Sequence, residues 1–405
     1  MASLLKNAKL LSSERVDLRL RGGRIEAIST GLSSQPGETV FGLAGRVIVP
    51  GFVDAHVHLD KTLSLGENLE NTSGTLLEAI ELWQAAKPGF DRENYLARAR
   101  RAVAMAVSHG TTAMRTHVDV DENGLTALET LLELRGEVRD KLELQIVALG
   151  SAGGSAKEAE MMAEALRLGA DFVGGAPALS PEPYQAVRAS LDLAERLDKP
   201  VDLHIDETDD PGMRTLGLLA EEVIARGLQG RVTAGHCVSL MAMSEDQATS
   251  IAVKVAEAEI DVVSLPAVNL ILQGRGDTKA VRRGVTRIKM LLEAGVNVSV
   301  ASDNVRDPFN PFGNYDLLWL ANLSGHVAQL TGSEERDTLW QLVGVNPART
   351  LGLDYGVKPG CAADLVVLAS RDPADCLASL PSKQAVLKSG AVVYGELEPA
   401  KEVPA

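Results

Sequence analysis

The chain has 405 residues, of which 45% are hydrophobic and 23% charged, and its formal net charge at pH 7 is -15. This composition can supply a large folded core, whereas the acidic balance argues against a nucleic-acid partner, whose phosphates bind basic surfaces. No apolar stretch is long enough to cross a bilayer and no signal-peptide pattern opens the chain, so we expect a cytoplasmic protein without a membrane partner. The three cysteines are widely spaced and predict neither a disulfide framework nor a thiolate zinc site.

Both ends of the chain carry short segments in which apolar and polar residues alternate. They are residues 16–20, 24–28, 363–368 and 391–394. Alternation interrupted by glycine is typical of short, half-buried strands. We therefore expect residues 1–49 and 355–405 to form one small β-sandwich domain built from both termini.

The central part of the chain, residues 50–354, alternates apolar runs with amphipathic stretches of helical length. The predicted strands are the run that leads into His56 and residues 112–118, 144–149, 172–174, 201–205, 232–234, 262–265 and 296–301. Eight strands separated by helices predict an α/β fold of the (β/α)8 TIM-barrel type. In such barrels the carboxyl ends of the strands build the active site.

A pair of histidines, His56 and His58, closes the first of these runs. Side chains two residues apart in a strand point to the same face, so the pair can place two imidazoles on one metal ion. Paired histidines also occur on solvated strands and loops, and the pair alone does not decide between the two interpretations.

Further candidate residues follow other predicted strands. His204 ends the fifth strand, with Glu207 three residues later, His236 ends the sixth, and Asp303 ends the eighth. Taken singly, each histidine could be structural, and Asp303 could cap a turn. Their common placement at strand ends favours a catalytic metal centre, in which Glu207 acts as a general acid or base.

These motifs give the chain a specific resemblance to the amidohydrolase superfamily, and within it to the cytosine deaminase-like branch. The matching segments are residues 50–60, 116–121, 204–210, 235–236, 272–275 with 282–284, and 303–313. The resemblance implies that His56, His58, His204 and Asp303 bind one divalent metal ion, either zinc or iron. It also implies that Glu207, His236 and Asp303 move protons.

The resemblance also implies the reaction. A divalent ion lowers the pKa of bound water toward about 7, which makes hydroxide available at neutral pH. Attack on a ring carbon that bears an amino group yields a ring carbonyl and ammonia. We therefore expect a metal-dependent aminohydrolase, or deaminase, whose substrate is a small nitrogen heterocycle, and the resemblance alone is compatible with a homo-oligomer.

Two departures from the cytosine deaminase pattern concern the substrate. Residues 150–154 are small where cytosine deaminases of this branch carry a substrate-reading glutamine, and Asn304 follows Asp303 where a second acidic residue is expected. Residues 302–307, together with Asp60 and Lys61, instead resemble N-isopropylammelide amidohydrolases. The candidate substrate contacts are Gln273, Arg275, Ser151 and Asn304.

Several alternatives stay open at this stage. The chain is also compatible with an N-alkylammelide-type amidohydrolase, with a cyclic amide hydrolase, and with a metal-binding protein that has no catalytic activity. Residues 173–176 contain no lysine at the end of the fourth strand, so a carbamylated-lysine site with two metals is not supported. The roles of His117, at the end of the second strand, and of Lys61 are not assigned.

Overall fold

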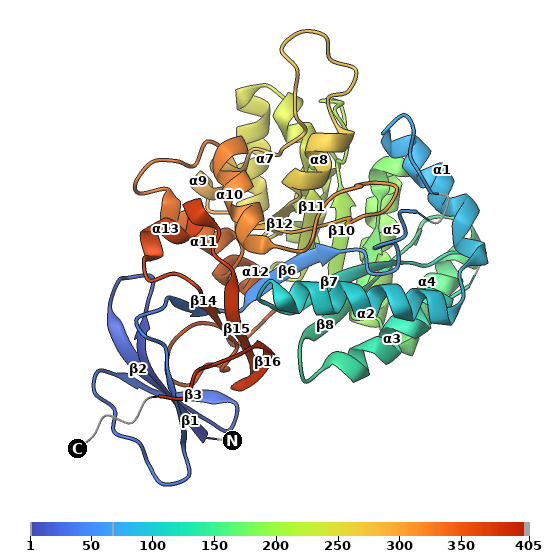
Figure 1. Cartoon of the computed structure of the whole chain (residues 1–405). Coiled ribbons are helices and arrows are strands. Elements are labelled where there is room, and N and C mark those ends of the chain that lie inside the picture. Colours follow the sequence, from blue (N-terminus) through green and yellow to red (C-terminus); the bar gives the residue numbers. More distant parts are fainter. Residues whose placement is uncertain (1, 67–68, 123, 401–405) are drawn as a thin grey trace.

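The computed structural model describes residues 2–66, 69–122 and 124–400. Within these residues, eight parallel strands with helices between them form a barrel, and two smaller sheets pack beside it (Figure 1). The barrel strands are β6 (Phe52–Val57), β7 (Thr111–Asp119), β8 (Glu143–Leu149), β9 (Phe172–Gly175), β10 (Val201–Ile205), β11 (Val232–His236), β12 (Asp261–Ser264) and β13 (Val298–Val300). Each strand pairs with the next in sequence. The predicted α/β TIM barrel is confirmed.

The connecting helices lie on the outside of the barrel (Figure 1). They are α1 (Leu76–Ala86), α2 (Arg92–Ser108), α3 (Thr126–Val138), α4 (Ala156–Leu168), α5 (Pro183–Leu197), α6 (Thr215–Arg226), α7 (Glu245–Glu257), α8 (Pro266–Leu272), α9 (Ile288–Glu293), α10 (Leu317–Val327), α11 (Arg336–Leu342) and α12 (Val345–Thr350), with 3-10 turns η1 (Lys87–Gly89), η2 (Pro177–Leu179) and η3 (Val238–Ala242). Helix α5 buries Val187, Leu191 and Ala194, which share one face at helical spacing. No helix in the described part of the chain combines the length and apolar character needed to cross a membrane.

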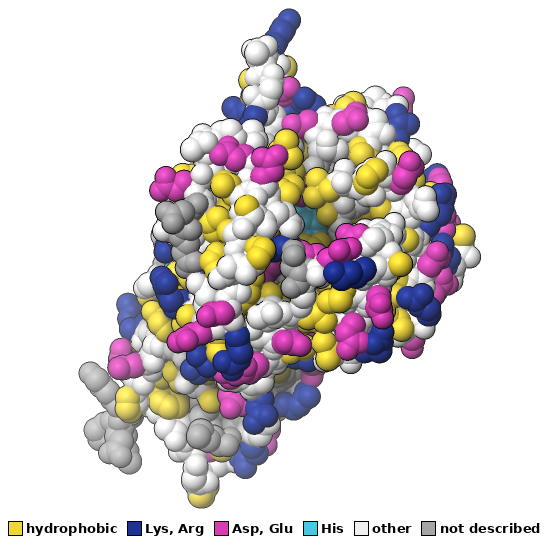
Figure 2. Space-filling model, turned by 90° about the vertical axis from the view of Figure 1, so that its right-hand side faces the viewer, with side chains coloured by type: hydrophobic (Ala, Val, Ile, Leu, Met, Phe, Trp, Pro, Cys, Tyr) yellow, Lys and Arg dark blue, Asp and Glu magenta, His cyan; other side chains and the backbone are white. Residues whose placement is uncertain are grey.

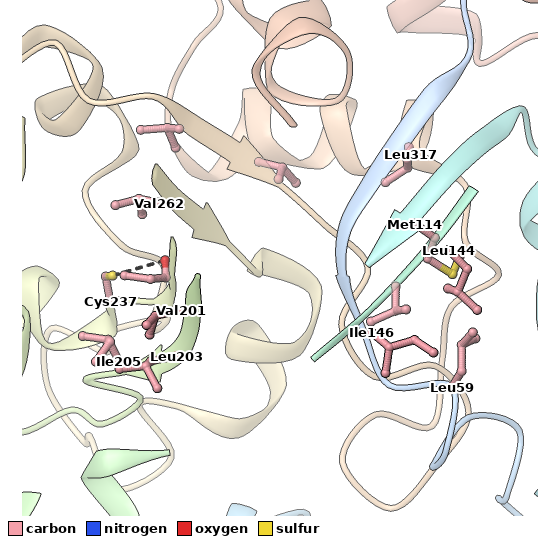
Figure 3. Close-up of a cluster of buried hydrophobic side chains, with 14 of the residues drawn as sticks. Leu59, Met114, Leu144, Ile146, Val201, Leu203, Ile205, Cys237, Val262 and Leu317 are labelled. Carbon is pink, nitrogen blue, oxygen red and sulfur yellow. Dashed lines mark hydrogen bonds between the residues drawn. The ribbon is translucent and has the colours of Figure 1, made fainter. Parts of the chain in front are cut away.

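Alternation along each barrel strand separates the core from the interior of the barrel. On β10, Val201, Leu203 and Ile205 pack in the hydrophobic core (Figure 3), whereas Asp202 and His204 alternate with them. Successive side chains of a strand point to opposite faces, so the polar pair faces into the barrel. The same periodicity that builds the core therefore delivers polar side chains to the barrel axis.

The barrel closes where its last strand meets its first. Residue Asp303, just after β13, forms a parallel bridge with Val57, and its backbone N–H donates to the carbonyl oxygen of His56 at 2.8 Å. Closure therefore brings together chain segments almost 250 residues apart, each of which carries predicted metal ligands.

The chain ends form two four-stranded sheets. One contains β1 (Ala2–Lys9), β2 (Arg15–Arg21), β3 (Arg24–Ser29) and β4 (Thr39–Gly42); the other contains β5 (Ile48–Pro50), β14 (Leu365–Leu368), β15 (Lys383–Lys388) and β16 (Ala391–Gly395), with helix α13 (Pro373–Ser379) between β14 and β15. Leu5, Leu18 and Leu20 of the first sheet share a buried cluster with Leu365 and Leu387 of the second. The predicted β-sandwich from both termini is confirmed.

The apolar run that leads into His56 divides at Gly51. Strand β5 pairs with β14 in the terminal sheet, whereas β6 belongs to the barrel. A Cβ atom at Gly51 would lie 2.1 Å from Oγ1 of Thr112, so only glycine allows the chain to pass this close to β7. One continuous apolar run in the sequence therefore serves two sheets.

Candidate functional site

The predicted metal ligands meet at the carboxyl ends of the barrel strands. His56 is the penultimate residue of β6 and His58 follows that strand, while His204 lies on β10 and Asp303 follows β13. All four side chains are buried, and His56 is fully so. Burial lowers the pKa of His56 and His204 well below the usual value for histidine, so both imidazoles are neutral and can bind a metal.

The distances among these four residues match a metal centre. Nε2 of His204 lies 3.2 Å from Nε2 of His56 and 3.2 Å from Nε2 of His58. Oδ1 of Asp303 lies 3.3 Å from Nε2 of His58 and 3.7 Å from Nε2 of His56. An ion bound tetrahedrally at about 2.1 Å holds its ligand atoms roughly 3.3 Å apart. Neither carboxylate oxygen of Asp303 has a hydrogen-bond partner among the described residues, and these four side chains fit a divalent ion.

Two of the site residues have an unusual backbone conformation. His236 and Asp303 adopt φ values of 68° and 58°, in the left-handed region that residues other than glycine rarely occupy. His236 is the last residue of β11 and Asp303 lies three residues after β13, so both conformations occur at the carboxyl ends of barrel strands. Conformations of this kind persist where the surrounding structure imposes them, which is common at functional sites.

Glu207 and His236 lie beside the ligand cluster. Oε1 of Glu207 is 3.6 Å from Nδ1 of His236, and Nε2 of His236 is 4.0 Å from Oδ2 of Asp303. Burial, together with the charge of Asp303, raises the pKa of Glu207 well above its usual value. Burial lowers the pKa of His236 to about 4. The site therefore places a carboxyl group whose protonated form burial favours next to an imidazole that is neutral at pH 7.

Asn269 on helix α8 is a site residue that the sequence did not indicate. Its amide nitrogen Nδ2 donates to Nδ1 of His236 at 3.1 Å, which leaves Nε2 as the nitrogen that carries the proton of the neutral ring. Nothing in the residues 266–272 distinguishes this asparagine from a polar residue at a helix surface. Only the fold brings it to His236.

A second layer of polar side chains supports the ligands from inside the barrel. The ring centroids of His117 and His56 lie 3.9 Å apart, and Nε2 of His117 is 3.6 Å from Oδ1 of Asp202. Nη1 of Arg115 in turn donates to Oδ2 of Asp202 at 2.8 Å. His117 therefore lies beneath the ligand cluster, within reach of His56 and Asp202.

Lys61 lies on the other side of His58, in a buried ionic cluster. Its Nζ atom is 2.6 Å from Oδ1 of Asp119, 3.1 Å from Oδ2 of Asp60 and 3.5 Å from Nδ1 of His58. Burial alone would lower the pKa of Lys61, but Asp119 and Asp60 more than offset burial and raise it, so the ammonium group stays charged. Trp83 completes the cluster, because its Nε1–H donates to Oδ2 of Asp119 at 2.8 Å.

Most of the predicted metal ligands and proton-transfer residues border an open cavity of about 720 Å³. Figure 2 shows the hollow in this face of the molecule, with histidine visible at its bottom. His58, His204, Glu207, His236 and Asp303 line it, and helix α1 and the segments after β7, β8 and β9 supply most of its other walls. A volume of this size is typical of small-molecule sites.

The four candidate substrate contacts separate into two pairs. Ser151 and Asn304 line the cavity. Gln273 and Arg275, which both belong to the described residues, are not among the lining residues. Gln273 is buried, and the guanidinium group of Arg275 reaches the backbone of Gly74, where a Cβ atom would lie 1.9 Å from it. A role of Gln273 and Arg275 in substrate binding stays a prediction.

Comparison with known proteins agrees with this fold and site. A model of the amidohydrolase family matches residues 86–394, and the chain belongs to this family. The chain is a hydrolase that acts on carbon–nitrogen bonds other than peptide bonds. The family uses a divalent metal, and the His/Asp cluster fits such an ion.

Three relatives illustrate the likeness. The chain is 32% identical to a pterin deaminase of Rhizobium rhizogenes, covering 88% of this chain and 83% of the relative. It is 29% identical to the N-isopropylammelide isopropyl amidohydrolase of Pseudomonas sp. strain ADP, covering 96% of each chain. The crystal structure of 5-methylcytosine deaminase from Klebsiella pneumoniae superposes with a TM-score of 0.92 at 32% identity, covering 99% of each chain. The resemblance seen in the motifs is confirmed.

Proposed function

We propose that this protein is a metal-dependent deaminase that converts an amino-substituted nitrogen heterocycle and water into a ring carbonyl compound and ammonia. One observation carries the proposal: His56, His58, His204 and Asp303 converge at distances suited to one divalent ion, beside Glu207, whose pKa burial raises. Imidazole and carboxylate ligands suit zinc or iron. The pterin and 5-methylcytosine deaminases among the relatives support deamination over other carbon–nitrogen hydrolysis.

In this reaction a metal ion would activate the water, and the side chains would transfer the protons. A divalent ion at this site supplies Lewis acidity, which makes water a nucleophile at neutral pH. Glu207, whose raised pKa favours the protonated carboxyl group, gives its proton to the ring nitrogen next to the carbon under attack. Asp303 accepts a proton from the attacking water. His236, neutral at pH 7, orients the oxygen through its Nε2–H.

Proton transfer then releases the amine. The carbon–nitrogen bond to the exocyclic amino group breaks as that nitrogen receives the proton held by Asp303. The ring carbon keeps the oxygen of water as a carbonyl, and ammonia leaves. The remaining proton of the attacking water returns to Glu207 as the carbonyl forms, so atoms and charges balance without a redox partner.

A second candidate is release of an alkylamine instead of ammonia. The Pseudomonas amidohydrolase, whose name specifies removal of an isopropyl-substituted amine from N-isopropylammelide, matches this chain over 96% of its length. The same carboxyl groups serve either leaving group, because both leave as neutral amines after protonation.

Product analysis tests the proposal. Metal-loaded protein is incubated with aminopyrimidines, aminotriazines, aminopurines, pterin and N-alkylammelides, and ammonia and alkylamines are quantified separately. We expect ammonia from one class of ring, and none from the Asp303→Ala variant. Alkylamine release alone would establish the second candidate. Absence of both amines would contradict deamination and favour cyclic amide hydrolysis or a non-catalytic metal site.

A further inference from the structure

The cavity extends from the metal ligands toward one side of the barrel only. The ligands and proton-transfer groups come from β6, β10, β11 and β13 or the residues after them, whereas the rest of the lining comes largely from α1, η1 and the segments after β7, β8 and β9. We call this second part the extension. A substrate with its reacting carbon at the ligands therefore places the remainder of its body over β7 to β9.

Small residues leave the floor of the extension unfilled. Residues 150–154, which follow β8, are two glycines flanking serine and alanine and a further glycine; Gly175 is the last residue of β9 and Ala176 follows it. A Cβ atom at Gly150 would lie 2.5 Å from Sδ of Met162, and one at Gly175 would lie 3.2 Å from the carbonyl oxygen of Gly150. The glycines therefore let the two segments pack closely, and the side chains that these segments present to the cavity, those of Ser151, Ala152 and Ala176, are small.

The opposite wall is apolar and fixed. Leu76, Ile80 and Trp83 of helix α1 all line the cavity, and their spacing of four and three residues places them on one face of the helix. Trp83 is 1% exposed, and its hydrogen bond to Asp119 holds the indole ring in place. A rigid apolar wall of this kind suits a flat aromatic ligand.

The charged groups in the extension neutralise one another. Lys61 pairs with Asp119 at 2.6 Å, and Lys87 forms an ion pair with Asp121. Because each lysine already has a carboxylate partner, and Glu158 and Glu182 add further carboxylates to the lining, the extension offers no uncompensated positive charge to an anionic ligand. Ser151 and Gln185 add uncharged polar groups to the lining, which suit the heteroatoms of a neutral ring.

We propose that the preferred substrate is a neutral, fused two-ring aminoheterocycle, whose reacting ring lies over the metal ligands and whose second ring occupies the extension. This inference rests on the proposed deaminase function and deepens it. A single six-membered ring at the ligands would leave the apolar wall of α1 and the floor after β8 and β9 unused. Small residues at the floor thus determine specificity, rather than catalysis.

The test compares ring classes in one ammonia assay. The kcat/KM of wild-type protein is measured on pterin, guanine and adenine as fused rings, and on cytosine, 5-methylcytosine and aminotriazines as single rings. We expect the best fused ring to exceed the best single ring at least tenfold. Ala152→Leu and Ala176→Leu, which fill the floor, should each lower kcat/KM for the fused ring at least tenfold and for a single ring less than threefold.

Ala85→Leu is the matched control, because Ala85 is exposed on α1 and does not line the cavity. It should leave both ring classes unchanged. A wild-type preference for single rings or for nucleosides overturns the inference, as does an equal loss for both ring classes in a folded, metal-loaded floor variant. If neither floor variant folds, the wild-type ratio alone decides. Ammonia from no ring overturns the proposed function as well, whereas ammonia from single rings only overturns this inference alone.

Discussion

At the scale of single residues, Asp303 combines structural and chemical roles in one position. Its backbone N–H closes the barrel on His56, its φ of 58° turns the chain, and its carboxylate faces the histidine cluster with no hydrogen-bond donor among the described residues. A buried carboxylate without a partner costs free energy unless a cation balances it. A bound cation would remove this cost of burying the Asp303 carboxylate, so metal binding should stabilise the folded state.

Replacing Glu207 by glutamine tests its role as proton donor. Glu207→Gln keeps the size of the side chain but removes the acidic proton, whose loss burial disfavours. General acid catalysis contributes about 10²–10⁴-fold, so kcat should fall by that factor while KM changes little. Metal content, measured on the same samples, should equal that of wild-type protein. A variant that keeps more than a tenth of the wild-type kcat would refute this role.

The raised pKa of Asp307 should make the free energy of unfolding depend on pH. Burial raises its pKa from 3.8 to about 6 in the folded protein, although the amide of Asn304 donates to its Oδ2 at 2.7 Å. The folded state therefore binds the proton more tightly than the unfolded state, and the resulting stability is present below pH 3.8 and is lost as pH rises through 6. Between pH 5 and 7.5 this group should remove roughly 1 kcal/mol from the free energy of unfolding.

Urea unfolding of wild-type protein and Asp307→Asn at pH 5 and pH 7.5 isolates this contribution. Because asparagine does not titrate, the difference in unfolding free energy between the two proteins should move by roughly 1 kcal/mol in favour of the variant as pH rises. A difference that does not depend on pH would show that Asp307 titrates normally in the folded protein.

At the scale of strands and helices, sequence periodicity predicted which segments form the barrel strands but not which distant segments they contact. Apolar runs identified all eight barrel strands, because a buried parallel strand needs a continuous apolar run. The same signal missed the division at Gly51, since it reports burial rather than the identity of the partner strand, and the segments predicted at the chain ends did not include strands β1, β4 and β15. Asn269 and the pairing of Lys61 with Asp119 depend on contacts between distant segments, which periodicity does not contain.

Arg115 links several of these elements inside the barrel. From β7, its guanidinium donates to Asp202 on β10, to Oγ1 of Thr233 on β11 at 3.1 Å, and to the carbonyl oxygen of Thr350 at the end of α12 at 2.8 Å. Arg115→Met should lower the free energy of unfolding by about 3–5 kcal/mol, because it leaves the carboxylate of Asp202 buried without its cation.

The double variant Arg115→Met/Asp202→Asn is the control for that mechanism. Removing the charge of Asp202 together with its partner should recover part of the stability lost in Arg115→Met, as measured by urea unfolding. If the double variant is as unstable as the sum of the two single variants, the loss comes from packing or from the bonds to Thr233 and Thr350 instead.

At the scale of the whole molecule, the metal site and the closure of the barrel coincide. The four predicted ligands belong to β6, β10 and β13 or the residues directly after them, and β13 meets β6 at the bridge between Val57 and Asp303. An ion at this site therefore ties the first and last barrel strands together. Binding to the folded state only stabilises it by mass action, by about 2.7 kcal/mol when the free ion is at 100 times its Kd.

Removing the metal with a chelator should consequently lower Tm by several degrees, and adding zinc or iron(II) back should restore it. Thermal unfolding of matched variants separates this effect from damage by the chelator. Asp303→Ala lacks a ligand and should respond weakly, whereas Glu207→Gln keeps all four ligands and should respond as wild-type protein does. Equal responses in both variants would place the stabilising ion elsewhere. Because Glu207→Gln should lose proton transfer but keep the stabilising ion, the two proposed roles of the site, stabilising the closed barrel and moving protons, can be measured independently.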